Sequence, residues 1–316
     1  MTDKITKAFV LGAGLGTRLR PLTESVPKPL IPIFHKPLIT FVLDHLIAAG
    51  VKSFVVNTHH RPEAFREFFS DGTYRGHAVQ LVHEPEILGT GGGIKNVEPL
   101  LKNELFISYS GDILTDIDLP SLIDEHFRAG NDVTLALRET HLGKDVAVEG
   151  NRVVDIARRY GLEGRYDFAG ICVWTPAVFE QIPPAEHISY IPILADWIGQ
   201  GGKIGSVVLN DRKWFNIGSR REYLAVHRAI ADENWKPAYV PEAEWPIRIA
   251  PDARIDSTAR LSGFYSVAGG CQVGAGATLE DTILWPGAQI ASRSHLRNCI
   301  VRSDQSAAGE HNDAVI

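Results

Sequence analysis

The stretch that decides the fold runs from Leu11 to Leu30 and reads L-G-A-G-L-G-T-R-L-R-P-L-T-E-S-V-P-K-P-L. The apolar run at 8–11 precedes it and predicts a short buried strand. Three glycines, Gly12, Gly14 and Gly16, then follow within a single turn. Because glycine has no Cβ, backbone N–H groups in such a turn can approach a ligand closely. The pattern therefore predicts a strand that leads into a ligand-binding loop.

Two basic residues, Arg18 and Lys28, follow these glycines. Backbone N–H groups, a guanidinium and an ammonium together favour an anionic ligand, with phosphate as the natural choice. A P-loop is excluded because no lysine directly follows the glycines, and the G-x-G-x-G spacing differs from a dinucleotide fingerprint. A glycine-rich turn without a ligand would not explain the two basic residues.

The pattern G-x-G-T-R-x-x-P-x-T followed by P-K-P resembles the signature of sugar-1-phosphate nucleotidylyltransferases, the NDP-sugar pyrophosphorylases. The resemblance implies that Arg18 and Lys28 are catalytic. It also implies that the loop binds a nucleoside triphosphate through Leu11, Ala13, Gly14, Gly16 and Thr17.

Composition limits the remaining possibilities. The chain has 316 residues and a formal net charge of −6, which argues against broad binding of nucleic acid. Its three cysteines are widely spaced and form neither a disulfide framework nor a zinc pattern, as expected for a cytoplasmic protein. We expect no signal peptide, no transmembrane helix and no membrane partner.

Strands and helices alternate over the first half of the chain. Strands are predicted at 4–11, 53–57, 79–82 and 105–109, and helices at 37–50, 62–69, 90–101 and 119–127. This order indicates an α/β fold with a Rossmann-like, mixed but mostly parallel sheet flanked by helices, as in the nucleotide-diphospho-sugar transferase fold that the resemblance implies. Ligands of such sheets bind beyond the carboxyl ends of the strands. We assign residues 1–236 to a catalytic nucleotidyltransferase domain.

Two further loops follow predicted strands. The first, 83–93, carries an acid and a glycine cluster, and resembles the family element that embraces the nucleobase. By this resemblance Glu84, Gly89 and Thr90 bind the nucleotide, with Glu84 on the base. The second loop, 110–116, carries Asp112 directly after a strand. A carboxylate there suits Mg²⁺, which takes one or two protein carboxylates together with phosphate oxygens.

Lys213 to Ser219 resembles the family's W-x-D-I-G-T element, whose acid is the second metal ligand. Here Asn216 occupies the place of that acid, and an amide oxygen also coordinates Mg²⁺. Asp112 and Asn216 are thus the predicted metal ligands. The alternative is that Asn216 only caps the helix that follows.

The expected sugar site departs most from the family pattern. The resemblance assigns Asp112, Glu163 and Gly170 to the sugar, but the lysine that commonly follows the glutamate is missing. Arg165 or Arg159 is a candidate replacement. Phe168-Ala169-Gly170-Ile171 is more similar to N-acetylmuramate-1-phosphate uridylyltransferases.

Proline-rich residues 237–248 predict a linker, after which an apolar residue recurs every six positions. The series is Ile249, Ile255, Leu261, Val267, Val273 and Leu279, then Leu284, Ile290 and Leu296 after one step of five. With small residues four positions later, this is a hexapeptide repeat. We assign 249–302 to a short C-terminal β-helix, which the family resemblance implies is left-handed. It is expected either to pack on the catalytic domain or to build a homo-oligomer. Residues 303–316 are expected to be a polar tail.

The predicted reaction joins a nucleoside triphosphate to a sugar 1-phosphate and releases diphosphate. A catalytic domain followed by a β-helix favours mannose 1-phosphate with GTP, and the F-A-G-I element favours uridylyl transfer to N-acetylmuramate 1-phosphate or a related hexose 1-phosphate. A non-catalytic nucleotide-sugar-binding regulatory subunit is the alternative of another class. A hexapeptide acyltransferase would need a basic histidine in a cleft, and only His295 and His311 are candidates.

Overall fold

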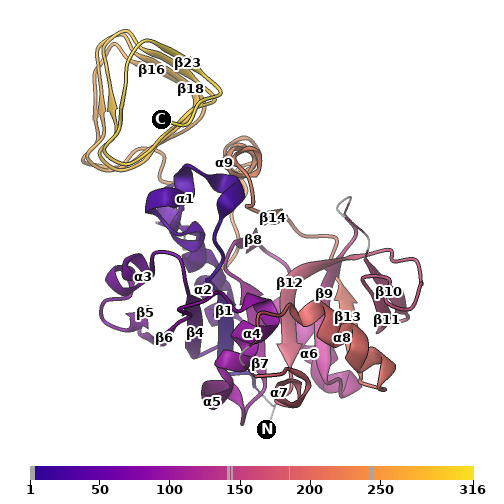
Figure 1. Cartoon of the computed structure of the whole chain (residues 1–316). Coiled ribbons are helices and arrows are strands. Elements are labelled where there is room, and N and C mark those ends of the chain that lie inside the picture. The colour runs from indigo at the N-terminus through magenta and orange to yellow at the C-terminus, as the bar shows by residue number, and fades with distance from the viewer. Residues whose placement is uncertain (1–3, 141–142, 144, 185, 242, 244) are drawn as a thin grey trace. The chain divides into compact units, whose positions relative to one another are not determined.

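The computed structural model describes residues 4–140, 143, 145–184, 186–241, 243 and 245–316 (Figure 1). The chain forms two compact units. Unit 1 comprises Met1–Leu15 and Val42–Trp214, and unit 2 comprises Gly16–Phe41 and Phe215–Ile316. In this division the second half of the glycine loop groups with the C-terminal residues, and the domain boundary at 236 stays a prediction.

A ten-stranded sheet forms the centre of unit 1 in the described residues, in the order β10-β11-β13-β9-β12-β7-β1-β4-β6-β5. Its strands are β1 (Lys7–Leu11), β4 (Ser53–Thr58), β5 (Thr73–Tyr74), β6 (His77–His83), β7 (Phe106–Ser110), β9 (Val133–Arg138), β10 (Val146–Glu149), β11 (Arg152–Ile156), β12 (Asp167–Trp174) and β13 (Ile204–Val208). Strands β7, β1, β4 and β6 are parallel, whereas β12 runs antiparallel to both of its neighbours. The mixed, mostly parallel sheet predicted from the sequence is confirmed.

Helices cover both faces of this sheet (Figure 1). They are α2 (Leu38–Ala48), which begins in unit 2, α3 (Pro62–Phe68), α4 (Gly89–Asn96), α5 (Glu98–Leu101), α6 (Leu119–Ala129), α7 (Val178–Gln181) and α8 (Tyr190–Gly199). One face packs its alternate residues, such as Phe9, Phe106 and Trp174, in one apolar cluster with α4, α7 and α8. This burial of both faces explains why the central strands are almost continuously apolar.

Helices α2 and α6 lie on the opposite face of the sheet, where α2 makes specific polar contacts. His45 of α2 contacts the Tyr109 hydroxyl at 3.2 Å and the Ile117 carbonyl at 3.0 Å. Burial lowers the pKa of His45 to about 4, against the opposing effect of the Ile117 carbonyl. On α6, Asp118 caps the helix by accepting from the Ser121 N–H, the role expected of an acid at a helix start.

Unit 2 begins with the second half of the glycine loop. This segment contains two short 3-10 turns, η1 (Thr17–Leu19) and η2 (Lys28–Leu30), helix α1 (Leu22–Ser25) and strands β2 (Pro32–Ile33) and β3 (Lys36–Pro37). It packs on α9 (Arg220–Glu233), where the Tyr223 hydroxyl donates to the Pro32 carbonyl and accepts from the Trp285 indole N–H. Residues of the predicted linker join this core, because Trp245 packs edge-on against Phe34 and Phe41.

The C-terminal residues form the expected β-helix, whose coils have a triangular outline in Figure 1. Its strands are β15 (Arg254–Ile255), β16 (Arg260–Val267), β17 (Gln272–Val273), β18 (Thr278–Leu284), β19 (Gln289–Ile290), β20 (His295–Arg297), β21 (Ile300–Val301), β22 (Ser306–Ala307) and β23 (Glu310–Asn312). Arg254 pairs in parallel with Gln272, and Gln272 with Gln289. The first of these coils therefore takes 18 residues, which is three full hexads, and the next takes 17, with one hexad shortened. Apolar hexad residues from Ile255 to Leu296 fill or line the interior together with small residues such as Ala277 and Ala288, whereas Ile249 is exposed.

The predicted polar tail at 303–316 is wrong. Strand β22 pairs with β19 and β23 pairs with β20, and the Arg302 N–H donates to the Ile316 carbonyl. Ala307 and Ile316 lie in or against the interior of the β-helix. The hexad rule missed this coil because His295 pairs with Glu310, so the last coil is shorter and breaks the period of six.

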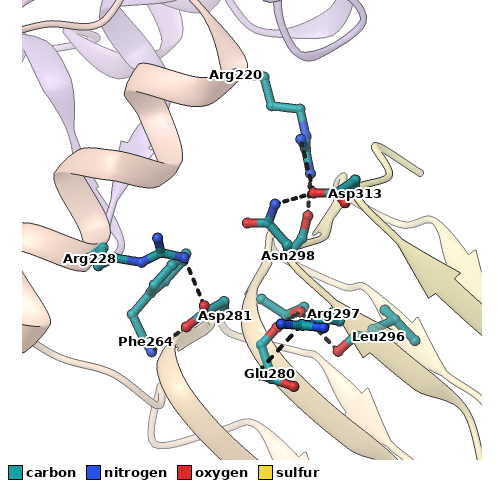
Figure 2. A network of polar contacts seen from close by, with 10 residues as sticks. Arg220, Arg228, Phe264, Glu280, Asp281, Leu296, Arg297, Asn298 and Asp313 are labelled. Atoms are coloured by element: carbon teal, nitrogen blue, oxygen red, sulfur yellow. Dashed lines mark hydrogen bonds and ion pairs between the residues drawn. The ribbon is translucent and has the colours of Figure 1, made fainter.

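Arginines of α9 hold the β-helix within unit 2. Figure 2 shows Arg220 and Arg228 of α9 reaching residues of the β-helix. Arg220 donates to the Asn298 carbonyl, and Arg228 forms a 2.8 Å ion pair with Asp281. Asp281 also accepts from the Phe264 N–H, so its carboxylate is fixed on both sides. Such contacts give the β-helix a defined attachment to the helix that follows Asn216.

The burial of Ala307 in the last coil can be tested by mutation. We expect Ala307→Asn to lower the free energy of unfolding by about 1–3 kcal/mol, because it places an amide in an apolar interior. Ala308→Asn is the matched control, since Ala308 is exposed beside it. Chemical denaturation of both variants measures the difference. Equal free energies of unfolding for the two variants would contradict the burial of Ala307 in a last coil.

Candidate functional site

The carboxyl ends of the parallel strands place several predicted site residues at one edge of unit 1. Leu11 of β1 pairs with Asn57 of β4 on one side and with Ser110 of β7 on the other. Asn57 pairs in turn with Val82 of β6. The loops that carry Gly12, Glu84 and Asp112 therefore leave the sheet side by side, where ligands of α/β sheets bind.

Gly12 begins the glycine loop and is held by Asn57. The Gly12 N–H donates to Asn57 Oδ1 at 2.8 Å, and a Cβ at Gly12 would lie 2.7 Å from the Asn57 carbonyl oxygen. Only glycine fits so close to the neighbouring strand. The loop then continues through buried Ala13 to exposed Gly14.

Glu84 is fully buried beneath this edge. Its Oε1 accepts from Asn57 Nδ2 at 2.7 Å, and its Oε2 accepts from the Leu88 N–H at 3.1 Å. Both carboxylate oxygens therefore accept from protein donors, and the role predicted for Glu84 at the nucleobase stays a prediction. Nothing in the local sequence signals this burial, because a loop glutamate next to Pro85 resembles a solvated ligand-binding residue.

The glycine cluster of the loop 83–93 is explained by close packing on residues 186–190. The N–H groups of Gly91 and Gly92 both donate to the Ile188 carbonyl. A Cβ at Gly89 would lie 2.7 Å from that same oxygen. The Thr90 hydroxyl accepts from the Tyr190 N–H at 3.1 Å. The first amides of α4 therefore bind protein, and the role predicted for Gly89 and Thr90 in nucleotide binding stays a prediction.

Asp112 lies at the end of β7 and is partly exposed. The preceding Gly111 donates its N–H to the Leu11 carbonyl, and a Cβ there would approach the same oxygen to 2.7 Å. This crossing fixes Asp112 next to the start of the glycine loop. Burial, and to a smaller extent the charges of Cys172 and Asp112, raise the pKa of Tyr190.

Besides Asp112, the predicted sugar-binding residues are Gly170 on β12 and Glu163 in the loop before it. Gly170 is buried with φ of +80°, and a Cβ there would collide with Ile113. Glu163 is exposed. The two candidate replacements for the missing lysine both pair with carboxylates, Arg165 with Glu139 at 3.0 Å and Arg159 with Asp196 at 2.8 Å.

Arg138 is a cation that no sequence motif singled out. It is the last residue of β9 and pairs with Asp167 of β12, next to the Phe168-Ala169-Gly170 element. Because β9 is parallel to β7, Arg138 lies at the same sheet edge as Asp112. Its Nε is buried and has no hydrogen-bond partner in the described part of the chain. Arg138 is identified only from the order of the strands, which places β9 beside β12 and cannot be derived from the local sequence.

Unit 2 holds the basic residues of the glycine loop. Gly16 has φ of +62°, and its carbonyl accepts from the Thr23 hydroxyl at 2.8 Å. Thr17 and Arg18, which follow it, are exposed, and Lys28 is buried. A Cβ at Gly218 would lie 2.7 Å from the Arg18 guanidinium. The structure thus places Arg18 over the turn that carries Asn216.

That turn is itself fixed by the start of α9. Glu222 accepts from the Gly218 N–H and the Ser219 hydroxyl, both at 2.9 Å, and Ser219 caps the helix. Asn216 Oδ1 is buried and accepts no hydrogen bond from any described residue. An amide oxygen left without a donor suits a hard cation such as Mg²⁺. Among the described residues, no group of three or more His, Cys, Asp or Glu side chains forms a metal cluster.

Comparison with known proteins agrees with this arrangement of loops. The family model described as "Nucleotidyl transferase" matches residues 7–233. The chain belongs to this family of sugar-1-phosphate nucleotidylyltransferases. It is 31% identical over 298 residues to a mannose-1-phosphate guanylyltransferase of Mycobacterium tuberculosis, covering 90% of this chain and 80% of the relative. It is also 30% identical over 224 residues to an N-acetylmuramate alpha-1-phosphate uridylyltransferase of Neisseria meningitidis, covering 67% of this chain and 93% of the relative.

A solved structure shares the fold of this family member. The inositol-1-phosphate CTP transferase from T. maritima superposes with a TM-score of 0.60 at 22% identity, over 70% of this chain and 93% of that one. Within the described ranges, no helix is both long and apolar enough to cross a membrane.

Proposed function

We propose that this nucleotidylyltransferase uses GTP and mannose 1-phosphate to form a GDP-sugar and diphosphate. The main structural support for this reaction lies in unit 2. There the Arg18 guanidinium lies over the turn of Asn216, whose buried side-chain oxygen accepts no hydrogen bond from any described residue. The choice of substrates is supported by the guanylyltransferase relative, which matches 90% of this chain.

The reaction needs two polyanions in line and charge neutralised at the α-phosphorus. A sugar phosphate is already a competent nucleophile at neutral pH, so no covalent intermediate is required. In the proposal, amides of residues 13–17 hold the triphosphate, Arg18 bridges its outer phosphates with a bidentate fork, and Lys28 acts as a point charge at the α-phosphate. Asp112 and Asn216 are each proposed as oxygen ligands of Mg²⁺, which supplies further charge neutralisation when bound.

A uridylyltransferase acting on N-acetylmuramate 1-phosphate or a related hexose 1-phosphate is the second candidate. It is favoured by Phe168-Ala169-Gly170-Ile171 and by the uridylyltransferase relative, which is 93% covered. A grid of the common nucleoside triphosphates against sugar 1-phosphates, followed by diphosphate release, separates the two. Turnover with GTP and mannose 1-phosphate alone supports the first proposal. Absence of turnover across the grid would favour a regulatory subunit.

Charge removal tests the two residues with the clearest roles. We expect Arg18→Ala and Asp112→Asn each to lower kcat by a factor on the order of 10², the cost of one preorganised charge contact. Arg66→Ala and Asp124→Asn are matched controls, because both side chains are exposed on helices of unit 1. Diphosphate release under saturating substrates measures kcat, and near-normal turnover of either site variant contradicts its assigned role.

The metal assignment of Asn216 has a separate test. Asn216→Ala removes the orphaned oxygen, so we expect the Mg²⁺ concentration for half-maximal rate to rise about tenfold. Asn216→Asp supplies an oxygen at the same place and should leave this concentration unchanged or lower it. Magnesium titrations of the rate measure both. An unaltered requirement in the alanine variant would leave Asn216 as a turn residue.

Arg138 is proposed as the cation that takes the place of the missing lysine at the sugar phosphate. We expect Arg138→Met to raise the KM for the sugar 1-phosphate about tenfold while the KM for the triphosphate stays constant, because one charged hydrogen bond is lost. Arg165→Met is the comparison, since Arg165 is exposed and paired with Glu139. The reverse pattern in the two variants would assign the sugar phosphate to Arg165.

A further inference from the structure

We propose that Asn57 and Glu84 are a pair of positioning residues that fix the start of the glycine loop relative to the loop 83–93. The pair is defined by three consecutive hydrogen bonds, from Gly12 N–H to Asn57, from Asn57 to Glu84 and from Leu88 N–H to Glu84. Its kinetic consequences rest on the function proposed above. Its hydrogen bonds do not, and can be tested independently.

Both side chains are shut off from solvent. Asn57 is 2% exposed and Glu84 is 0% exposed. A Cβ at Gly93 of α4 would lie 2.9 Å from Asn57 Nδ2 and 3.1 Å from Glu84 Oε1, so the helix closes over the pair. A buried carboxylate is retained only when its oxygens have donors, and here both oxygens have one.

The direction of every hydrogen bond in the pair is fixed by its two ends. Gly12 and Leu88 each contribute a backbone N–H, which only donates. The Gly12 N–H requires an oxygen on the Asn57 amide at that position, so the amide nitrogen must face Glu84. Glu84 then receives a donor on each side and must be an acceptor at both oxygens. A carboxylate meets this requirement, and a carboxamide does not.

Single substitutions therefore break the pair in opposite ways. In Glu84→Gln, one orientation of the amide sets its NH₂ against the Leu88 N–H. The other orientation sets it against the Asn57 NH₂. In Asn57→Asp, two carboxylate oxygens face each other at the 2.7 Å contact with Glu84. Each change alters only one or two atoms, so little packing volume is lost.

The double variant Asn57→Asp with Glu84→Gln restores the pattern. The carboxylate introduced at position 57 would accept from the Gly12 N–H and from the new amide NH₂ at position 84, and the amide oxygen would accept from the Leu88 N–H. Charge, atom count and every donor–acceptor match are then as in the wild type. Recovery in the double variant is expected only if hydrogen-bond direction, rather than the individual side chain, is what matters.

The first measurement is hydrogen exchange of the Gly12 and Leu88 amides by NMR in the full chain without substrates. We expect each single variant to lose protection by about tenfold or more at one or both amides, and the double variant to recover it. Glu67→Gln is the matched control, because Glu67 is exposed on α3. Unchanged protection in both single variants would overturn the pair.

The second measurement is steady-state kinetics with the best substrate pair from the grid. We expect each single variant to lower kcat/KM for the triphosphate by a factor on the order of 10², since a misplaced loop loses its alignment, and the double variant to return within a few-fold of wild type. A double variant no better than the worse single variant contradicts the proposal, even if a single variant fails to fold. A wild-type chain without turnover would defeat the proposed function and leave the exchange result to decide the pair.

Discussion

Parallel pairing of β1 with β4 and β7 is the constraint on which the site in unit 1 depends. Because neighbouring parallel strands end at one edge, Gly12, the loop 83–93 and Asp112 all leave the sheet together. The closeness of these ends then dictates residue type. Gly12 and Gly111 lie against carbonyl oxygens of adjacent strands, where a Cβ would have no room. The sheet edge therefore requires glycine at these two positions, and ligand binding by the exposed part of the loop stays a prediction.

The sequence predicted this edge well because it depends on local signals. Apolar periodicity and chain order identify strands and helices, and the hexad pattern identifies the β-helix. The sequence failed where a residue's environment depends on a partner far along the chain. Nothing near Glu84 shows that Asn57 donates to one of its oxygens, and nothing near Gly91 shows that Ile188 approaches it. Arg138 escaped notice for the same reason, since only the strand order brings it beside β12.

In unit 2, one helix, α9, supports both the turn that carries Asn216 and the β-helix. The turn that carries Asn216 leads directly into α9, whose first residues fix that turn through Glu222 and whose arginines hold the β-helix. The same unit contains Arg18, which lies over Gly218. The β-helix therefore shares its support with the turn on which the proposed metal ligand lies. The contacts with α9 are expected to stabilise this short β-helix, because the terminal coils of a repeat have a neighbouring coil on one side only.

The buried pair of Asn57 and Glu84 shows why single-residue comparison misreads such a site. The requirement imposed by two backbone N–H groups is one amide and one carboxylate in series, and it is met with the carboxylate at either position. A substitution at one position leaves two like groups facing each other, so neither residue can change alone without leaving a buried donor or acceptor unmatched. Residue identity at 84 is consequently a property of the pair. A glutamate at position 84 can therefore be interpreted only together with the residue at position 57.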